Sequence, residues 1–243
     1  MVRYTISARS KRNDVPILDF LRRHFPALEF GQIDSVFGFV EPTTLYGGRI
    51  FTGRELTPLD VADLYNAGIG VRLPLTNHFA APDEYERSAA LLRKYHKARN
   101  AVIVTNDDLA KWIRRDFPLY RIEASVIKNL KTRERIEEAM DLYDTVVLPM
   151  ELNDNTGFLE QLTHKDRITL FANAGCALTC PSKICYMSVS KVNKGNGGEF
   201  MCSQPLKQRD MRGMVDFDLG HLQSLGFSRF KLLRSKNSGM TGF

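Results

Sequence analysis

The sequence lacks any run of about 18 consecutive apolar residues, so no transmembrane helix is expected. Its N-terminal stretch MVRYTISARSKRND is basic and lacks the apolar core of a signal peptide. With 43% hydrophobic and 26% charged residues, the 243-residue chain has the composition of an ordinary globular protein. We therefore expect a cytoplasmic protein without membrane insertion, with a single domain spanning residues 1–243.

Several motifs of well-known enzyme classes are also missing. No G-x-S-x-G and no H-E-x-x-H occurs, so the commonest serine hydrolase and zinc protease signatures are absent. No glycine-rich phosphate fingerprint follows the first expected strand, which disfavours dinucleotide binding. Ser125 has no base evident near it in the sequence, so a protease is only the third choice of function.

Cysteine is scarce, and its four copies are close together at Cys176, Cys180, Cys185 and Cys202, with the spacing C-x3-C-x4-C-x16-C. A reducing compartment disfavours disulfides, and clustered thiols there more often bind a soft metal as zinc or an iron–sulfur cluster. The C-x2-C knuckles of zinc ribbons are absent, and the x4 interval breaks the radical SAM pattern C-x3-C-x2-C. Zinc, an iron–sulfur cluster and four ordinary buried residues therefore all stay open on spacing alone.

Apolar strand-like stretches alternate with amphipathic helical stretches along the chain. Several of the strand-like stretches are almost continuously apolar, as in parallel sheets covered on both faces. This alternation predicts an α/β fold, a (β/α)8 barrel, with a doubly wound open sheet as the alternative. An irregular surface loop is expected over 186–215, within a cysteine-containing loop at about 174–215. The expected strands are 4–9, 33–40, 70–77, 100–106, 120–127, 144–151, 167–175 and 227–234.

Polar residues gather where these strands end, and a (β/α)8 barrel carries its active site at the C-terminal ends of its strands. Some of them have a structural explanation, because asparagines after strands often cap the next helix and paired glycines often permit a turn. Asn77, Asn106 and Asn153 are the asparagines to which capping applies. The expected substrate-binding residues are Arg9, Tyr46, Gly47, Gly48, Asn77, Asn106, Ser125, Asn153 and Asn173.

Three residues are candidates for the chemistry itself: Arg49, Glu151 and Lys231. Arg9, Arg49 and Lys231 would hold an anionic group, and the guanidinium of Arg49 suits a bidentate contact. Glu151 would serve as the general acid or base. A buried lysine without a partner is costly, so Lys231 is expected to pair with Glu123 or Glu151. His78, after a strand end, is the histidine expected near the site.

The formal net charge is +6, and the basic residues are concentrated in a few stretches. Many of these stretches are expected on helices, where they would form a solvated outer face. Attraction to a polyanion such as RNA is the functional interpretation. An RNA-binding or scaffold module with a structural zinc is therefore the alternative to an enzyme.

Taken in order along the chain, the motifs resemble those of the peptidase U32 family and its relatives. The resemblance covers nearly the whole sequence. The motifs are YGGR (46–49), LPLTN (73–77), EAS (123–125), VVLPME (146–151), NAGCALTCP (173–181) and GFSRFKLLR (226–234).

This resemblance implies a (β/α)8 barrel with a four-cysteine site, often a [4Fe-4S] cluster. Relatives are implicated in oxygen-independent hydroxylation of RNA bases or of the ubiquinone ring, and others carry a collagenase-like protease label. For this chain it implies that Cys176, Cys180, Cys185 and Cys202 ligate the cluster. It also implies that Asn77 and the loop Gly47-Gly48-Arg49 line the pocket. We therefore expect an iron–sulfur modifying enzyme, hydroxylase-like, acting on a small anionic or nucleic-acid substrate.

Overall fold

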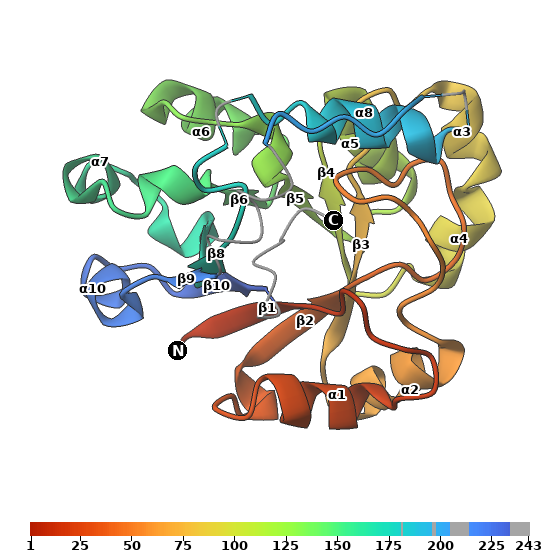
Figure 1. Ribbon diagram of the computed structural model, residues 1–243, viewed down its shortest axis with the longest axis horizontal. Helices are drawn as coiled ribbons and strands as arrows, with labels where there is room; N and C mark the ends of the chain where they lie inside the picture. Colours follow the sequence, from red (N-terminus) through yellow and green to blue (C-terminus); the bar gives the residue numbers. More distant parts are fainter. Residues whose placement is uncertain (181, 196–197, 205–213, 234–243) are drawn as a thin grey trace.

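The computed structural model describes residues 1–180, 182–195, 198–204 and 214–233, and its centre is a closed barrel of parallel strands (Figure 1). The barrel closes where the first strand pairs with the last, with Tyr4 beside Phe230. The predicted (β/α)8 barrel is confirmed, and the doubly wound alternative is wrong because the sheet has no open edge. In spatial order the strands are β1 (Arg3–Ser7), β10 (Arg229–Leu232), β7 (Ile168–Phe171), β6 (Thr145–Val147), β5 (Arg121–Ala124), β4 (Ala101–Val104), β3 (Gly70–Leu75) and β2 (Ile33–Phe37).

Helices between the strands cover the outside of the barrel (Figure 1). α2 begins as the sequence predicts, because Thr57 caps it through the backbone N–H of Asp60 and Pro58 occupies its first position. No helix in the described ranges is long and apolar enough to cross a membrane. The α-helices are α1 (Ile17–His24), α2 (Pro58–Asn66), α3 (Pro82–Arg87), α4 (Ala89–Lys94), α5 (Asp107–Asp116), α6 (Arg133–Ala139), α7 (Thr156–Glu160), α8 (Cys185–Asn193) and α10 (Leu219–Ser224).

The observed strands end earlier than the sequence pattern predicts. β6 stops at Val147, and Pro149 then precedes the short 3-10 helix Met150–Leu152 instead of extending the strand to 151. The strand expected over 167–175 divides into β7 and the two-residue β8 (Asn173–Ala174), which pairs antiparallel with β9 (Val215–Asp216). The residues after each strand therefore form loops at the C-terminal mouth of the barrel, where side chains can face a ligand.

One expected loop is instead a helix. α8 spans Cys185–Asn193, inside the stretch 186–215 that was expected to be irregular. The helix buries Cys185 and Val189, which lie four residues apart on one face. This apolar spacing is short, and the glycines and asparagines that follow it in the sequence favour a loop instead. α8 lies across the end of the barrel at which β3 and β4 end (Figure 1). The parts 196–197 and 205–213 of that stretch lie outside the described residues.

The barrel interior carries charges as well as apolar side chains. Arg72 on β3 donates to Glu123 on β5 and, at 2.9 Å, to Asp34 on β2. Lys231 on β10 lies 3.4 Å from the other oxygen of Glu123. Arg72, Glu123 and Lys231 are all buried, so the chain relies on their mutual pairing to offset the cost of removing them from water.

Candidate functional site

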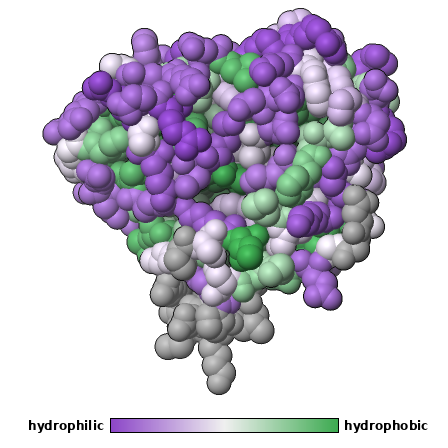
Figure 2. All heavy atoms as spheres, turned by 90° about the horizontal axis from the view of Figure 1, so that it is seen from above, coloured by the Kyte–Doolittle hydropathy of each residue, from purple (hydrophilic) through white to green (hydrophobic). Residues whose placement is uncertain are grey.

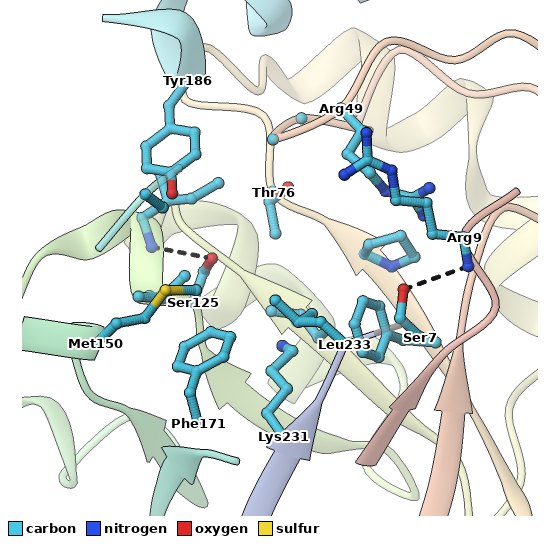
Figure 3. A pocket seen from close by; sticks show the side chains of 18 residues that line it. Ser7, Arg9, Arg49, Thr76, Ser125, Met150, Phe171, Tyr186, Lys231 and Leu233 are labelled. Carbon is cyan, nitrogen blue, oxygen red and sulfur yellow. Dashed lines mark hydrogen bonds between the residues drawn. The ribbon is translucent and has the colours of Figure 1, made fainter. Parts of the chain in front are cut away.

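A cavity opens at the C-terminal mouth of the barrel (Figure 3). Its volume is about 110 Å³, several times what one water molecule needs, so it suits a small ligand. The surface seen in Figure 2 is hollowed near its centre, with hydrophobic atoms inside a mostly hydrophilic surround. Polar and charged groups of the lining come from several strands and loops: Ser7, Arg9, Arg49, Thr76, Ser125 and Lys231.

Arg49 is held in place on one side of the cavity. Its two terminal nitrogens both donate to the carboxylate of Glu55, one of them at 2.7 Å, and its guanidinium lies over the Phe39 ring at 4.4 Å. Burial would raise the pKa of Glu55, but Arg49 outweighs it and holds the pKa below the ordinary value. The bidentate face of Arg49 is thus occupied by Glu55, and a ligand would meet only its remaining N–H groups.

Arg9 adds a second cation to the same side. Burial and the nearby charge of Arg49 lower the pKa of Arg9 to about 10, which still leaves it charged at neutral pH. Both guanidinium groups thus lie at this wall of the cavity. Among the described residues that line the cavity, none is Asp or Glu. The lining therefore favours an anion.

Lys231 lies in the floor of the cavity. Its partner is Glu123, which is one of the two partners that the sequence predicts. Its ammonium also lies 4.5 Å from the centre of the Phe37 ring. Burial lowers the pKa of Lys231, and the charges of Arg72 and Arg49 lower it further, while Glu123 opposes the shift. This side chain combines a buried amine with access to a pocket.

Glu151, the expected acid or base, does not line the cavity. Its carboxylate pairs with Lys131 at 2.8 Å and with Lys183 at 3.0 Å. Burial would raise its pKa, but these two lysines lower it below the ordinary value. Since Lys183 lies between two of the cysteines, the structure places Glu151 as an ionised anchor for the cysteine segment.

The expected substrate-binding residues divide into two groups. Arg9, Gly47, Gly48 and Ser125 line the cavity, and Ser125 also caps the 3-10 helix Val126–Lys128. The others stabilise the loops behind the cavity, each through a backbone contact. Tyr46 Oη accepts from the N–H of Val40, Asn106 caps α5 by accepting from Leu109, Asn153 donates to the carbonyl of Phe171, and Asn173 pairs with both backbone groups of Leu233.

Asn77 connects three segments instead of capping a helix. Its Nδ2 donates to the carbonyls of Thr44, Tyr46 and Ser190, at 2.7, 3.2 and 2.9 Å. These bonds tie the loop after β2 to α8 at the end of β3. His78, expected near the site, lies outside the cavity lining, and its Nδ1 is 3.2 Å from Ser190 Oγ.

Replacing Asn77 with alanine should lower the free energy of unfolding by at least about 2 kcal/mol, because buried carbonyls lose their donor. Chemical denaturation measures this change. Asn106 is the matched control, since Asn106→Ala removes a helix cap and one long hydrogen bond to the carbonyl of His78, at 3.3 Å, and should cost about 1 kcal/mol. Serine should restore most of the stability at position 106 but not at 77, where one hydroxyl cannot reach three carbonyls. Equal rescue at both positions would contradict this role of Asn77.

The four cysteines lie in the segment beside the cavity, and none of them forms a disulfide in the part of the chain that the structure describes. Cys176 and Cys185 are buried, while Cys180 accepts a hydrogen bond from the N–H of Lys183 at 3.4 Å, and Cys202 accepts one from the N–H of Gln204 at the same distance. N–H donors of this kind stabilise sulfur as thiolate. They are typical of the surroundings of metal-bound cysteines.

The thiols lie close enough to affect one another's ionisation. Burial, followed by the charges of Cys180, Cys202 and Cys176, raises the pKa of Cys185 to about 12. At Cys180, burial also acts upward, but hydrogen bonds from Ser203 and the nearby backbone lower the pKa. Within the described part of the chain, however, no three His, Cys, Asp or Glu side chains stand close enough to hold one metal ion. The thiol donors nevertheless fit a soft metal by their chemistry.

The cysteine segment and the cavity share a border. Ala177 and Tyr186, each next to a cysteine in the chain, both line the cavity, and the Tyr186 hydroxyl points into it (Figure 3). Sequence reasoning did not find Tyr186, because its helix was expected to be a loop. It also passed over Ser7 and Thr76, although Ser7 ends β1 and Thr76 directly precedes Asn77.

Comparison with known proteins identifies the fold. No protein-family model matches the sequence, and no curated protein matches it. A solved structure titled "The Structure of the U32 Peptidase Mk0906" is similar over 97% of this chain and 94% of that chain, with a TM-score of 0.62 and 14% sequence identity. This chain therefore shares the fold of a U32 peptidase, as its motifs predict.

Proposed function

We propose that this protein is an iron–sulfur enzyme related to the U32 peptidases, which binds a small anionic substrate at the mouth of its barrel. The observation that carries the proposal is the shared border between two features. A cavity with Arg9, Arg49 and Lys231 in its lining, and no carboxylate among its described lining residues, lies directly beside the segment that bears the four cysteines. A substrate held by these cations would therefore lie next to a group bound by the thiols.

Cys176, Cys180, Cys185 and Cys202 would hold the cofactor. Four thiols that affect one another's ionisation suit a [4Fe-4S] cluster, as the resemblance of the motifs implies, with a single zinc as the alternative. Such a cluster, when bound, supplies either electron transfer or a Lewis-acidic iron. The chain's own residues would bind and orient the substrate, with Tyr186 able to donate a hydrogen bond from the cofactor side.

A modifying reaction of the hydroxylase type fits this arrangement better than proteolysis. The described residues of the cavity include Ser7 and Ser125, but no histidine or carboxylate lines the cavity to activate either hydroxyl. Both serine hydroxyls are also used locally, since Ser7 accepts from the N–H of Arg9 and Ser125 from that of Ile127. Four cysteines without a disulfide are consistent with a cytoplasmic location.

The cofactor is tested by measuring iron, sulfide and zinc in protein purified without oxygen. We expect about four irons per chain and a brown protein with broad visible absorption. Cys176→Ser and Cys185→Ser should each lose most of the iron, because both thiols are buried and no other cysteine can replace them. Met187→Ala, at an exposed position of the same helix, should keep it.

Two outcomes would contradict this assignment. Full iron content in Cys176→Ser would show that this thiol is not a ligand. A colourless protein with one zinc would instead favour the RNA-binding or scaffold module, whose affinity for RNA should fall steeply as salt is raised.

A further inference from the structure

The charged cluster inside the barrel holds more positive than negative groups. Arg72, Arg121 and Lys231 face two carboxylates, Asp34 and Glu123. Arg72 binds both carboxylates. Arg121 binds Asp34 as well, with 3.0 Å between its terminal nitrogen and the carboxylate oxygen. Arg229 also lies close enough to interact with Asp34 and Glu123, so positive charges outnumber negative ones in this largely buried cluster, and losing one proton would lessen that excess.

Lys231 is the member of the cluster that can lose this proton. A guanidinium keeps its proton in proteins, so none of the arginines can supply it. The Lys231–Glu123 distance of 3.4 Å is also longer than an ordinary N–H···O bond, whereas Arg72 occupies the other oxygen of Glu123 closely. The pKa of Lys231 is lowered in accord with this picture, first by burial and then by Arg72.

The amine of Lys231 is directed toward the cavity (Figure 3). Phe37, Phe171 and Leu233 form apolar walls around it, which limit its hydration. Hydroxyls of Thr76 and Ser125 line the same space and can hydrogen-bond to a ligand oxygen. A neutral amine in such surroundings is a nucleophile, as lysines that form Schiff bases are.

We propose that Lys231 forms an imine with the carbonyl carbon of a small 2-oxo carboxylate bound in this cavity. The inference rests on the proposed function in one respect, the binding of a small anion there. Arg9 and Arg49 lie on one side of the pocket and Lys231 in its floor (Figure 3), so the arginines can hold the carboxylate while the carbonyl group reaches the amine.

The step is balanced without any further reactant. The lone pair of the neutral amine forms a C–N bond, and the carbonyl oxygen takes up a proton from the nitrogen to give a carbinolamine. Loss of that hydroxyl with the second nitrogen proton releases one water and leaves the C=N bond. If the imine is protonated, its positive charge stays beside Glu123, which the cluster keeps ionised.

The test uses pyruvate as the probe and sodium cyanoborohydride, which reduces an imine to a stable secondary amine. The full-length protein is incubated with both, and the adduct is located by peptide mass spectrometry. Because the neutral amine is the reactive form and the pocket holds the carboxylate beside it, Lys231 should carry several-fold more adduct than the exposed Lys94. Pyruvate binding without the reductant is measured in parallel by calorimetry.

The outcomes separate this inference from the proposed function. Adduct concentrated at Lys231, and absent from Lys231→Arg, would support it, because arginine keeps the charge beside Glu123 but cannot form the imine. Pyruvate binding with no adduct at Lys231 would overturn the imine and leave the anion site intact. Neither binding nor adduct would overturn both, and adduct spread evenly over surface lysines would also overturn the inference. The comparison of adduct at Lys231 and at other lysines uses only the wild-type protein, so it does not depend on whether a variant folds.

Discussion

Replacing Arg72 with methionine is expected to lower the free energy of unfolding by about 3–5 kcal/mol, the loss typical of breaking a buried ion pair from one side. Arg72 is only 3% exposed and donates to three side chains on two other strands, β2 and β5. Its Nε bonds Ser35 at 2.9 Å, and its terminal nitrogens bond Asp34 and Glu123. Methionine fills a similar volume but leaves two carboxylates without their main counter-charge.

The same variant should change how stability depends on pH. In the wild type, burial would raise the pKa of Asp34 and of Glu123, but Arg72 holds both below their ordinary values of 3.8 and 4.5. Each therefore stabilises the fold above its ordinary pKa, and the contribution is lost as pH falls through the lowered pKa. Without Arg72 this contribution shrinks, so the difference between variant and wild type should be largest near pH 7 and should narrow below about pH 4.

Urea denaturation at several pH values measures both effects. Arg87→Met is the matched control, because Arg87 pairs with Asp83 across one helical turn with both side chains more than 60% exposed. That change should alter the free energy of unfolding by less than about 1 kcal/mol at every pH. Similar losses in the two variants would mean that the interior cluster contributes no more than a surface pair.

The sequence predicts the parts of this molecule that depend on local pattern. The eight barrel strands follow from alternation of apolar stretches with helical ones, and the Asn106 cap follows from its place before α5. The pairing of Lys231 with a carboxylate also follows, from the cost of burying an unpaired amine. The strands and the cap depend on neighbouring residues, whereas for Lys231 the sequence predicts the need for a carboxylate and leaves two candidates, of which Glu123 lies 108 positions away.

The residues that sequence reasoning placed differently depend on distant contacts. Glu151 follows a strand as an active-site acid would, but Lys183, 32 positions later, meets it and makes it an anchor. Asn77 resembles a cap and instead bonds Ser190, 113 positions away. Tyr186 reaches the cavity only because α8 folds back across the barrel mouth. None of these partners can be identified from spacing along the chain.

Replacing Gly47 with alanine should be the most damaging single-methyl change at the site. A Cβ there would lie 2.3 Å from the carbonyl oxygen of Thr76 and 2.8 Å from the backbone nitrogen of Asn77. Both contacts are with backbone, which cannot move aside as a flexible side chain would. We expect a loss of about 2–3 kcal/mol in the free energy of unfolding, at the upper end for overpacking, and weaker binding of anions such as pyruvate, since Gly47 lines the cavity beside Arg49.

Gly157→Ala is the control that separates crowding from the mere loss of a glycine. Gly157 lies in α7 with nothing within 4 Å of its would-be Cβ. Alanine there should raise stability by about 0.5–1 kcal/mol, because glycine disfavours the helix. If Gly47→Ala were tolerated as well as Gly157→Ala, the loop would not be packed against the end of β3. In that case the glycines of the YGGR motif would serve only to form a turn. In the structure, Gly47 approaches the backbone of Thr76 closely, so this glycine helps to hold the cavity open.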